Sequence, residues 1–579
     1  MRHRDFYNGF EIEDGVFVSV EGETEKKVMP EGATLVRYNG NEERVTIPQG
    51  ISYIDSDAFE NNCDIKSVVI PDSVKVIWSY AFYGCKNLES VIIPNTVTRI
   101  CRGAFTGTPW LEELKRENGT SATVVNGILI EPDSSDFGYE DYEYVIPEGV
   151  KKIPSMSIIN DERVNYCEEE MHILYVSIPK SVLQIAGDAF GFKNGIVIKG
   201  YHDSYAEYYA KRHRLSFKEL VAQSSDNPVL NWELDGDGNL QVFGMGKMPD
   251  FANGLKPPWH ERCKEISKVV IHEGITSIGR CSFKDCTELK SAEIPISVTE
   301  IGKEAFFNCR KLSSILIPSS VVCIDDAAFY GCESLSDVYL PPCLLRLGRG
   351  TFGECSKLSS VNIPESLAEI EEETFYACNA LTHITIPDTI TYIGSKAFCG
   401  SGLIEITLPK CISAIYELTF AYCLKLRKAV LPRKFKHHMN ETAEIKEMAF
   451  FNCLQLNAIE IPHNTEYIEQ GAFAACESLT SIVIPNTVKR IDNTAFYKCT
   501  KLQTVTFQFY TPGCTHIWRI GKDAFAGCSA LQSITIPDSV QQIDSGAFSD
   551  CISLRDVRFS PQTQIGENAF ANTTFEKNN

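Results

Sequence analysis

Apolar residues recur along this chain with a period of about 23 residues, much longer than the period of a single helix or strand. Each repeat contains a short alternating segment such as SVIIP, residues 90–94. In it Val91 and Ile93 point to one face, and Ser90 and Ile92 point to the other. Strict alternation is typical of a β-strand. The pattern therefore predicts one short strand in each repeat.

A phenylalanine marks a second fixed place in the repeat. Seventeen residues, called station Phe residues here, mostly stand 23 positions apart: Phe59, Phe82, Phe105, Phe190, Phe283, Phe306, Phe329, Phe352, Phe375, Phe398, Phe420, Phe450, Phe473, Phe496, Phe525, Phe548 and Phe570. The residue before each is Ala thirteen times, Thr three times and Ser once. Only a small side chain therefore fits beside the aromatic ring. A degenerate eighteenth repeat is expected near Ile158.

Proline follows the last apolar residue of most predicted strands and should end each strand at the same height, because it has no amide hydrogen for a ladder. A V-x-x-I step such as Val97 and Ile100 then turns two more apolar side chains inward. A unit of this length cannot bury its apolar face alone, so neighbouring repeats must stack. The result is a strand-rich solenoid with strands ~4.8 Å apart and an aromatic spine in its core.

The repeat L-x-x-V-x-I-P-x-x-V-x-x-I-x-x-x-A-F-x-x-C resembles the BspA-like leucine-rich repeat family over about 45–200 and 265–575. The resemblance implies a leucine-rich-repeat solenoid of two tandem right-handed arrays, each with a parallel β-sheet on one face. It also implies short β-hairpin or helical caps and interruptions. Residues 108–130 resemble an interruption by a helix and a strand, 199–221 a helical terminating segment, and 231–251 a hairpin cap.

From this resemblance we expect an N-terminal array over 1–221, a β-hairpin cap or linker over 222–262, and a C-terminal array of about 13 coils over 263–579. The break in period at 221–262 also predicts a bend.

The net charge of the chain limits the classes of partner that it can bind. The 579 residues include 55 Lys+Arg and 76 Asp+Glu, a net charge of −21. A negative protein repels nucleic acid and anionic membranes. No apolar run approaches the ~18–20 residues that a membrane-spanning helix needs. The first residues, MRHRDFYNGFEIEDG, have no apolar h-region, so we expect no secretory signal within this chain.

Cysteine is the unusual component, with 22 residues. Twelve stand three places after a station Phe: Cys85, Cys286, Cys309, Cys332, Cys355, Cys378, Cys423, Cys453, Cys476, Cys499, Cys528 and Cys551. Thr108, Ser401 and Thr573 occupy the same slot, which therefore suits a small, weakly polar, buried group. Paired C-x-x-C spacings are absent, so we expect a ladder of buried thiols rather than disulfides or a metal site. No cofactor is expected.

DGDGN at 235–239 faintly resembles a calcium loop. The sixth and twelfth positions of such a loop would be Leu240 and Gly246, where Gly and an acid are required. A hairpin turn between two strands is the favoured interpretation.

A basic stretch reverses the sign of the chain locally. Residues 418–440 contain no Asp or Glu, and they include a seven-residue insertion between two repeats. Such a patch attracts anionic partners, although a solvated loop edge would have the same composition. The candidate binding residues here are Arg433, Lys434, Lys436, His437 and His438.

A second insertion at 508–521 contributes Tyr510, His516, Trp518 and Arg519, residue types that dominate binding hot spots. The two insertions are about three coils apart, so one partner could touch both. On the outward side of the predicted strands, Leu316 and Tyr339 would form a small apolar patch.

No nucleophile–base motif, carboxylate pair or H-E-x-x-H is present, so we do not expect an enzyme. The resemblance implies a non-catalytic binding or adhesion module of a microbial cell surface or secreted protein. Its expected partners are proteins, host extracellular-matrix or surface proteins among them, or glycans, without nucleic acid or membrane insertion. The alternative is an intracellular interaction scaffold or regulatory sensor, which a native start at Met1 would favour because it implies a cytoplasmic protein.

Overall fold

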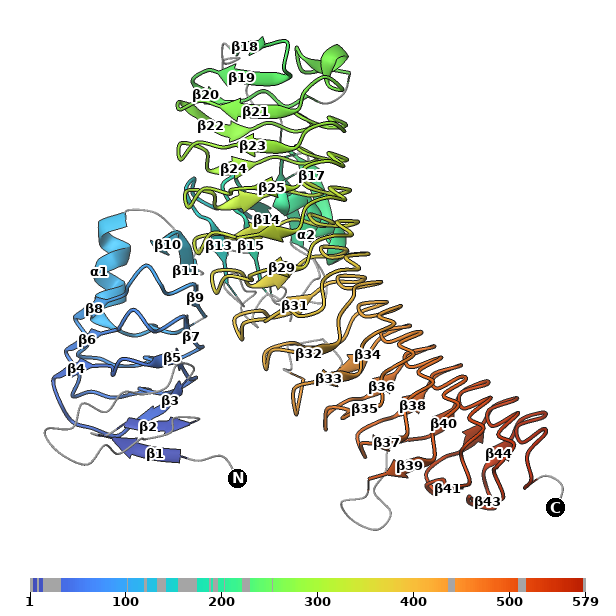
Figure 1. Ribbon diagram of the computed structural model, residues 1–579. Helices are drawn as coiled ribbons and strands as arrows, with labels where there is room; N and C mark the ends of the chain where they lie inside the picture. Colours follow the sequence, from blue (N-terminus) through green and yellow to red (C-terminus); the bar gives the residue numbers. More distant parts are fainter. Residues whose placement is uncertain are drawn as a thin grey trace, which may run out of the picture. The chain divides into compact units, whose positions relative to one another are not determined.

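The computed structural model describes residues 4–7, 10–13, 33–101, 103–118, 122–132, 142–154, 174–186, 189–190, 196–201, 204–220, 230–251, 254–435, 443–508 and 517–575. The repeat expected near Ile158 lies outside these residues. The chain divides into two compact units, 1–225 and 226–579. Each unit is a stack of coils built on parallel strands (Figure 1).

In the unit 226–579 most coils contribute to two ladders of strands, which hydrogen bonding divides into sheets of two to seven strands. The first ladder contains β18 (Asn231–Leu234), β19 (Asn239–Phe243), β21 (Lys268–Ile271), β23 (Ser291–Glu293), β25 (Ser314–Ile315), β27 (Asp337–Val338), β29 (Ser360–Val361), β32 (Glu405–Thr407), β33 (Lys428–Val430), β35 (Ala458–Ile459), β37 (Ser481–Ile484), β39 (Thr504–Phe507), β41 (Ser533–Thr535) and β43 (Asp556–Arg558). The second contains β20 (Gly246–Lys247), β22 (Ile275–Ile278), β24 (Glu300–Ile301), β26 (Cys323–Ile324), β28 (Arg346–Leu347), β30 (Glu369–Ile370), β31 (Tyr392–Ile393), β34 (Glu444–Ile445), β36 (Tyr467–Ile468), β38 (Arg490–Ile491), β40 (Arg519–Ile520), β42 (Gln542–Ile543) and β44 (Gln564–Ile565).

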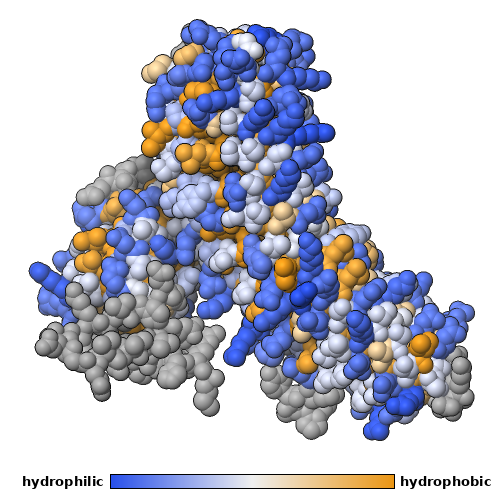
Figure 2. All heavy atoms as spheres, viewed as in Figure 1, coloured by the Kyte–Doolittle hydropathy of each residue, from blue (hydrophilic) through white to orange (hydrophobic). Residues whose placement is uncertain are grey.

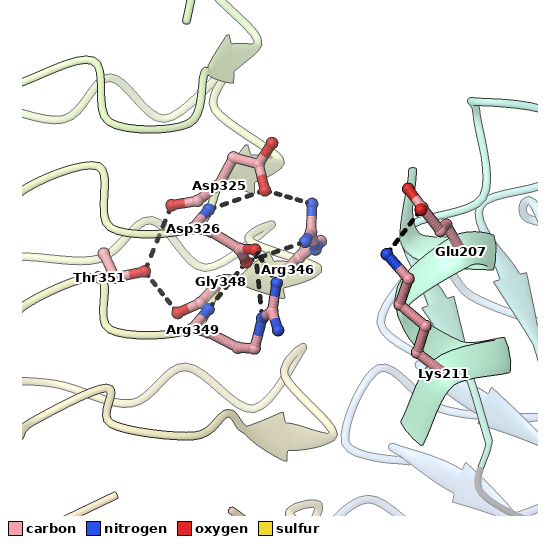
Figure 3. Close-up of polar contacts among 8 residues, drawn as sticks. All are labelled: Glu207, Lys211, Asp325, Asp326, Arg346, Gly348, Arg349 and Thr351. Carbon is pink, nitrogen blue, oxygen red and sulfur yellow. Dashed lines mark hydrogen bonds and ion pairs between the residues drawn. The ribbon is translucent and has the colours of Figure 1, made fainter. Parts of the chain in front are cut away.

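The unit 1–225 has the same plan with an interruption. Its first coils contain β1 (Arg4–Tyr7), β2 (Phe10–Glu13), β3 (Ala33–Tyr38), β4 (Arg44–Thr46), β5 (Ile51–Ile54), β6 (Ser67–Val69), β7 (Val76–Ile77), β8 (Ser90–Ile92) and β9 (Arg99–Ile100). Helix α1 (Pro109–Asn118) and the antiparallel pair β10 (Ala122–Val125) and β11 (Ile128–Pro132) follow. The rest contains β12 (Tyr142–Val145), β13 (Lys152–Ile153), β14 (Leu174–Ser177), β15 (Gln184–Ile185), β16 (Ile196–Gly200), α2 (Tyr205–Arg212) and β17 (Ser216–Glu219). In α2, Lys211 donates to Glu207 Oε1 at 2.7 Å (Figure 3).

Proline connects the two ladders of a coil. The carbonyl of Pro318, which ends the strand at β25, accepts a hydrogen bond from Val321 N at 3.1 Å. That turn points Val321 and Ile324 into the core, where both are fully buried. The V-x-x-I step is therefore itself a strand of the second ladder, which adds to the single sheet per array that the sequence predicted. The predicted strand-rich solenoid with hairpin and helical interruptions is confirmed.

The station Phe rings form a continuous stack through the second unit. From Phe283 to Phe570, the twelve consecutive ring pairs have centroids 5.0–5.9 Å apart and nearly parallel planes. Trp259 extends the stack at one end, 5.5 Å from Phe283, and its indole N–H donates to Ser282 O at 2.8 Å. At the other end Phe575 meets Phe570 edge-on at 5.3 Å. An aromatic residue outside the station positions thus covers each end of the stack, and Trp259 and Phe575 are called the aromatic plugs here.

The predicted cysteine ladder lies beside this stack. Cys378 is fully buried, and its thiol donates to the carbonyl of Phe352, in the preceding coil, at 3.1 Å. Ten other ladder cysteines make the same bond to the preceding station Phe at 3.0–3.3 Å. No disulfide bond joins cysteines of the described residues. Each thiol therefore joins two coils as a weak hydrogen-bond donor.

The stretch of each coil around its station Phe is called the return limb here. Two residues of each described return limb have a left-handed backbone. They stand two places before and two places after the station Phe, as at Thr494 (φ 54°) and Lys498 (φ 57°) around Phe496. This geometry lets the amides of alternate residues reach the next coil, as Lys498 N reaches Ala526 O at 2.8 Å. Most of these residues are not glycine, so the return limbs store strain in return for an unbroken ladder.

We expect Thr494→Gly to stabilise the second unit by about 0.5–1 kcal/mol, because a β-branched residue is poorly accommodated at positive φ. The urea midpoint of unfolding, followed by circular dichroism, measures the gain. Thr506→Gly is the matched control, since Thr506 lies in the extended strand β39. That change should destabilise the protein, and equal effects of the two substitutions would contradict the strain argument.

Candidate interaction surfaces

Leu316 and Tyr339 stand side by side on the outer face of the first ladder. β25 and β27 pair in parallel with Ser314 opposite Asp337, so the two residues that follow these strands occupy equivalent places in neighbouring coils. Their side chains are 76% and 66% exposed. The small apolar patch predicted at these two residues, the Leu316/Tyr339 patch, is therefore present and open to solvent.

Five basic side chains follow one another along the coil that contains β33. This group, called the basic strip, consists of Lys425, Arg427, Lys428, Arg433 and Lys434, all of them exposed. Arg427 Nε donates to Gln455 Oε1 at 3.1 Å. The other four form no ion pair with any described residue of the chain. Lys436, His437 and His438, the remaining predicted members, lie outside the described residues.

Exposed apolar side chains lie among these basic residues. Tyr422 and Leu424 precede the strand and are each 47% exposed, and Val430 in β33 is 39% exposed. Tyr422 has φ 61°, at a place where other coils often have Gly, Asn or Asp. Leu424 follows the ladder cysteine, where most other coils have a polar residue. Tyr422 and Leu424 are not among the residues predicted from the sequence, although these departures from the repeat are a signal that identifies them.

The strip is only one coil wide. On the coil before it, Glu405 of β32 pairs in register with Lys428. On the coil after it, Glu460 follows β35, whose Ala458 pairs with Lys428 on the other side. Both glutamates are exposed. Positive charge therefore runs along the coil rather than across the ladder.

Of the four candidate residues in the second insertion, Trp518 and Arg519 lie within the described residues. Trp518 is 40% exposed, but its backbone is held between coils through Lys489 O and the amide of Gln541. Arg519 lies in β40, and its Nη2 donates to Asp544 Oδ2 at 2.6 Å. Its guanidinium is thus already engaged within the solenoid. Tyr510 and His516 lie outside the described residues.

The candidate residues fall at separate places in the second unit. Trp518 and Arg519 belong to the second ladder, three coils after the coil of β34. The Leu316/Tyr339 patch lies four coils before the basic strip on the first ladder, about 20 Å at the usual strand spacing. Figure 2 shows exposed hydrophobic residues in small groups surrounded by hydrophilic ones on the face in view.

A buried charge cluster is the other polar constellation of this unit (Figure 3). Arg346 Nη1 lies 2.6 Å from Asp325 Oδ1 and its Nη2 lies 3.2 Å from Asp326 Oδ1, while Arg349 Nη2 lies 2.7 Å from Asp326 Oδ2. Burial raises the pKa of Asp325 despite Arg346. Burial also acts on Asp326, but the two guanidinium groups outweigh it and lower its pKa.

These four side chains are occupied with one another, so the cluster is a structural ion-pair network between neighbouring coils. In the parts of the chain that the structure describes, no group of three or more His, Cys, Asp or Glu side chains is placed to bind a metal. Within the same ranges, no helix has both the length and the apolar character needed to cross a membrane. The DGDGN segment forms the predicted turn, in which Asp235 Oδ1 accepts from Asp237 N and Asn239 N, each at 2.9 Å.

Comparison with protein families matches the chain to the BspA type leucine rich repeat region, in six copies. The matched residues are 38–124, 259–381, 345–443 and 443–577. They cover well over half of the chain. Comparison with curated proteins found no match.

Solved structures of bacterial leucine-rich repeat proteins are similar to this chain. A leucine-rich repeat protein from Bacteroides ovatus is 22% identical, with 61% of this chain and 92% of that chain covered and a TM-score of 0.43. A leucine rich cell surface protein from Faecalibacterium prausnitzii is 25% identical, with 62% and 94% covered and a TM-score of 0.38. The leucine rich repeat protein of T. pallidum is 27% identical, with 30% and 86% covered and a TM-score of 0.25.

Proposed function

We propose a function from the premise that this chain belongs to the BspA-type leucine-rich repeat family. The chain is a non-catalytic module that binds protein partners through its outer surface. Membership of a leucine-rich repeat family implies a protein-interaction scaffold. Solenoids of this kind are generally non-catalytic. Because function depends on sites rather than on the fold, the proposal rests on what the coils display.

The observation that supports it best is the Leu316/Tyr339 patch. A large aliphatic and an aromatic side chain stand exposed on adjacent coils of a rigid ladder, where Thr, Glu and Asn occupy many of the equivalent places and Val occupies three. Tyrosine in particular is enriched among residues that dominate binding energy. Because the ladder holds the backbone of both residues in fixed register, little backbone conformational entropy is lost when a partner covers them.

The site of action that we propose is the surface of a microbial cell or its surroundings, with host extracellular-matrix or surface proteins, or glycans, as partners. The family resemblance supports this proposal. The second candidate function is an intracellular scaffold or regulatory sensor, and the many buried thiols without disulfides favour it, because such thiols persist most readily in a reducing compartment.

Binding of the full chain to solubilised extracellular matrix and to cytosolic lysate tests both proposals. We expect saturable binding to a matrix protein that weakens at least about tenfold in Leu316→Ser/Tyr339→Ser, the loss typical of a hot-spot pair. Val483→Ser/Thr506→Ser, which changes outward residues of the same ladder, should leave it unchanged. Binding only to cytosolic proteins would favour the scaffold, and equal losses in both variants would contradict the assignment of this patch.

A further inference from the structure

The basic strip differs from an ordinary solvated edge in how its charges are arranged. Lys425, Lys428, Arg433 and Lys434 are exposed and form no ion pair with a described residue, although the chain carries a net charge of −21. Elsewhere on the same unit exposed lysines do pair between coils, as Lys311 does with Glu288 at 2.6 Å and Lys410 does with Asp388 at 3.7 Å. Four adjacent cations without such partners leave a local positive potential in a negative protein.

The geometry of the strip fits a narrow ligand. The residues 424–434 run along one coil, through β33 and past its proline, over at most ~35 Å of extended chain. Glu405 and Glu460 border the strip on the neighbouring coils, ~4.8 Å away at the usual strand spacing. A nucleic-acid duplex or a wide polyanion would lie over these carboxylates. A single extended segment along the coil would avoid both.

The exposed apolar residues beside the basic strip limit the class of partner further. Leu424 precedes Lys425, Val430 lies between Lys428 and Arg433, and Tyr422 stands at the same end as Leu424. A uniformly charged chain, such as a sulfated glycan or single-stranded nucleic acid, gains little from aliphatic side chains. A polypeptide with both acidic and apolar side chains gains from both kinds of contact, because burial of the apolar groups excludes water from the ion pairs beside them.

We infer that the basic strip, together with Tyr422, Leu424 and Val430, is a docking site for an extended acidic segment of a partner protein, about eight to ten residues long, that contains apolar side chains between its carboxylates. This inference rests on the proposed protein-binding function and deepens it. It names the kind of protein segment that the strip would bind.

A synthetic ten-residue peptide of Glu and Asp with two Leu residues is the first probe, and the same peptide with Ser in place of Leu is the second. Fluorescence anisotropy at 50 mM and 200 mM salt gives both affinities for the full chain. We expect saturable binding that weakens with salt, and tighter binding of the Leu peptide. Lys425→Gln/Arg433→Gln/Lys434→Gln should weaken both peptides about tenfold, as expected for the loss of three rim charges.

Two further variants distinguish the effect of the basic charges from the effect of the apolar contacts. Leu424→Ser/Val430→Ser should reduce the affinity for the Leu peptide to that for the Ser peptide and leave the latter unchanged. Lys357→Gln/Lys501→Gln/Lys522→Gln removes the same total charge from exposed sites elsewhere and should have little effect.

Equal losses in the strip variant and the charge-matched control would overturn the inference. So would tighter binding of a heparin oligosaccharide or of oligothymidylate than of either peptide. If the strip variant keeps its peptide affinity while Leu316→Ser/Tyr339→Ser loses a matrix partner, the docking site fails and the proposed function stands.

Discussion

Replacing Phe375 by alanine is expected to destabilise the second unit by about 3–5 kcal/mol, the usual loss when a buried ring is removed from a packed core. Phe375 is fully buried, with ring centroids of Phe352 and Phe398 at 5.9 and 5.4 Å. Because a solenoid is held together by contacts between neighbours, the loss falls at this one junction. The coils on its two sides should then unfold in separate steps.

Urea unfolding followed by circular dichroism measures the total effect, and thiol labelling locates it. Cys378, fully buried beside the substituted ring in the native chain, should react earlier in urea than the distant Cys528. Thr385→Ala, on the exposed side of the next coil, is the control and should change stability by less than about 0.5 kcal/mol. A single transition for Phe375→Ala, with both thiols exposed together, would contradict a local defect.

The second large effect is expected at alkaline pH. Burial raises the pKa of the Cys85 and Cys423 thiols to about 12, from an ordinary value of 9.0. It raises the pKa of eight further ladder thiols in the same direction: Cys286, Cys309, Cys332, Cys355, Cys378, Cys453, Cys476 and Cys528. The folded chain therefore holds these protons more tightly than the unfolded chain.

The stability that these thiols contribute is fully present below about pH 9 and is lost as the pH rises through 9 towards the folded values. Each proton that the folded chain keeps and the unfolded chain releases lowers the free energy of unfolding by about 1.4 kcal/mol per pH unit. For ten thiols the free energy of unfolding therefore falls by an amount on the order of 10 kcal/mol near pH 10. That is comparable to the whole stability of a typical domain. We expect cooperative unfolding near this pH in oxygen-free buffer.

Tyrosine and lysine titrate in the same range, so the test compares two chains. Cys355→Ser/Cys378→Ser/Cys453→Ser removes three titrating thiols from a slot where Ser401 occurs naturally. The free energy of unfolding should fall with pH less steeply than in the wild type, by about 4 kcal/mol per pH unit between pH 9 and 11. Equal slopes in urea titrations at several pH values would show that the thiols are not the cause.

Periodicity was sufficient to predict the solenoid because its cause is local and repeated. The alternation around each strand, the proline after it and the small residue before each station Phe recur with little variation. Two features needed the structure. A two-residue strand such as β28 is too short for alternation to mark it, and Trp259 joins the ring stack from a segment outside the repeat.

The candidate surfaces also include some features that the sequence predicts and others that need the structure. Alternation alone predicted that Leu316 and Tyr339 would face outward, and both do. The orientation of Tyr422 depends on a left-handed backbone, which periodicity does not reveal. Arg519 is paired with Asp544, a residue of the next coil 25 positions later, and only the register between coils identifies that partner.

The aromatic plugs at Trp259 and Phe575 bear on how such a molecule changes length. Most of the described coils between them present similar donors, acceptors and ring faces to the next, so a complete coil can be gained or lost without altering either end. Recombination between the repeated stretches of DNA that encode the coils would change the chain in whole steps of about one strand spacing, ~4.8 Å. Natural selection can therefore adjust the distance between two surface patches by changing the number of repeats between them, while the side chains within each patch stay as they are.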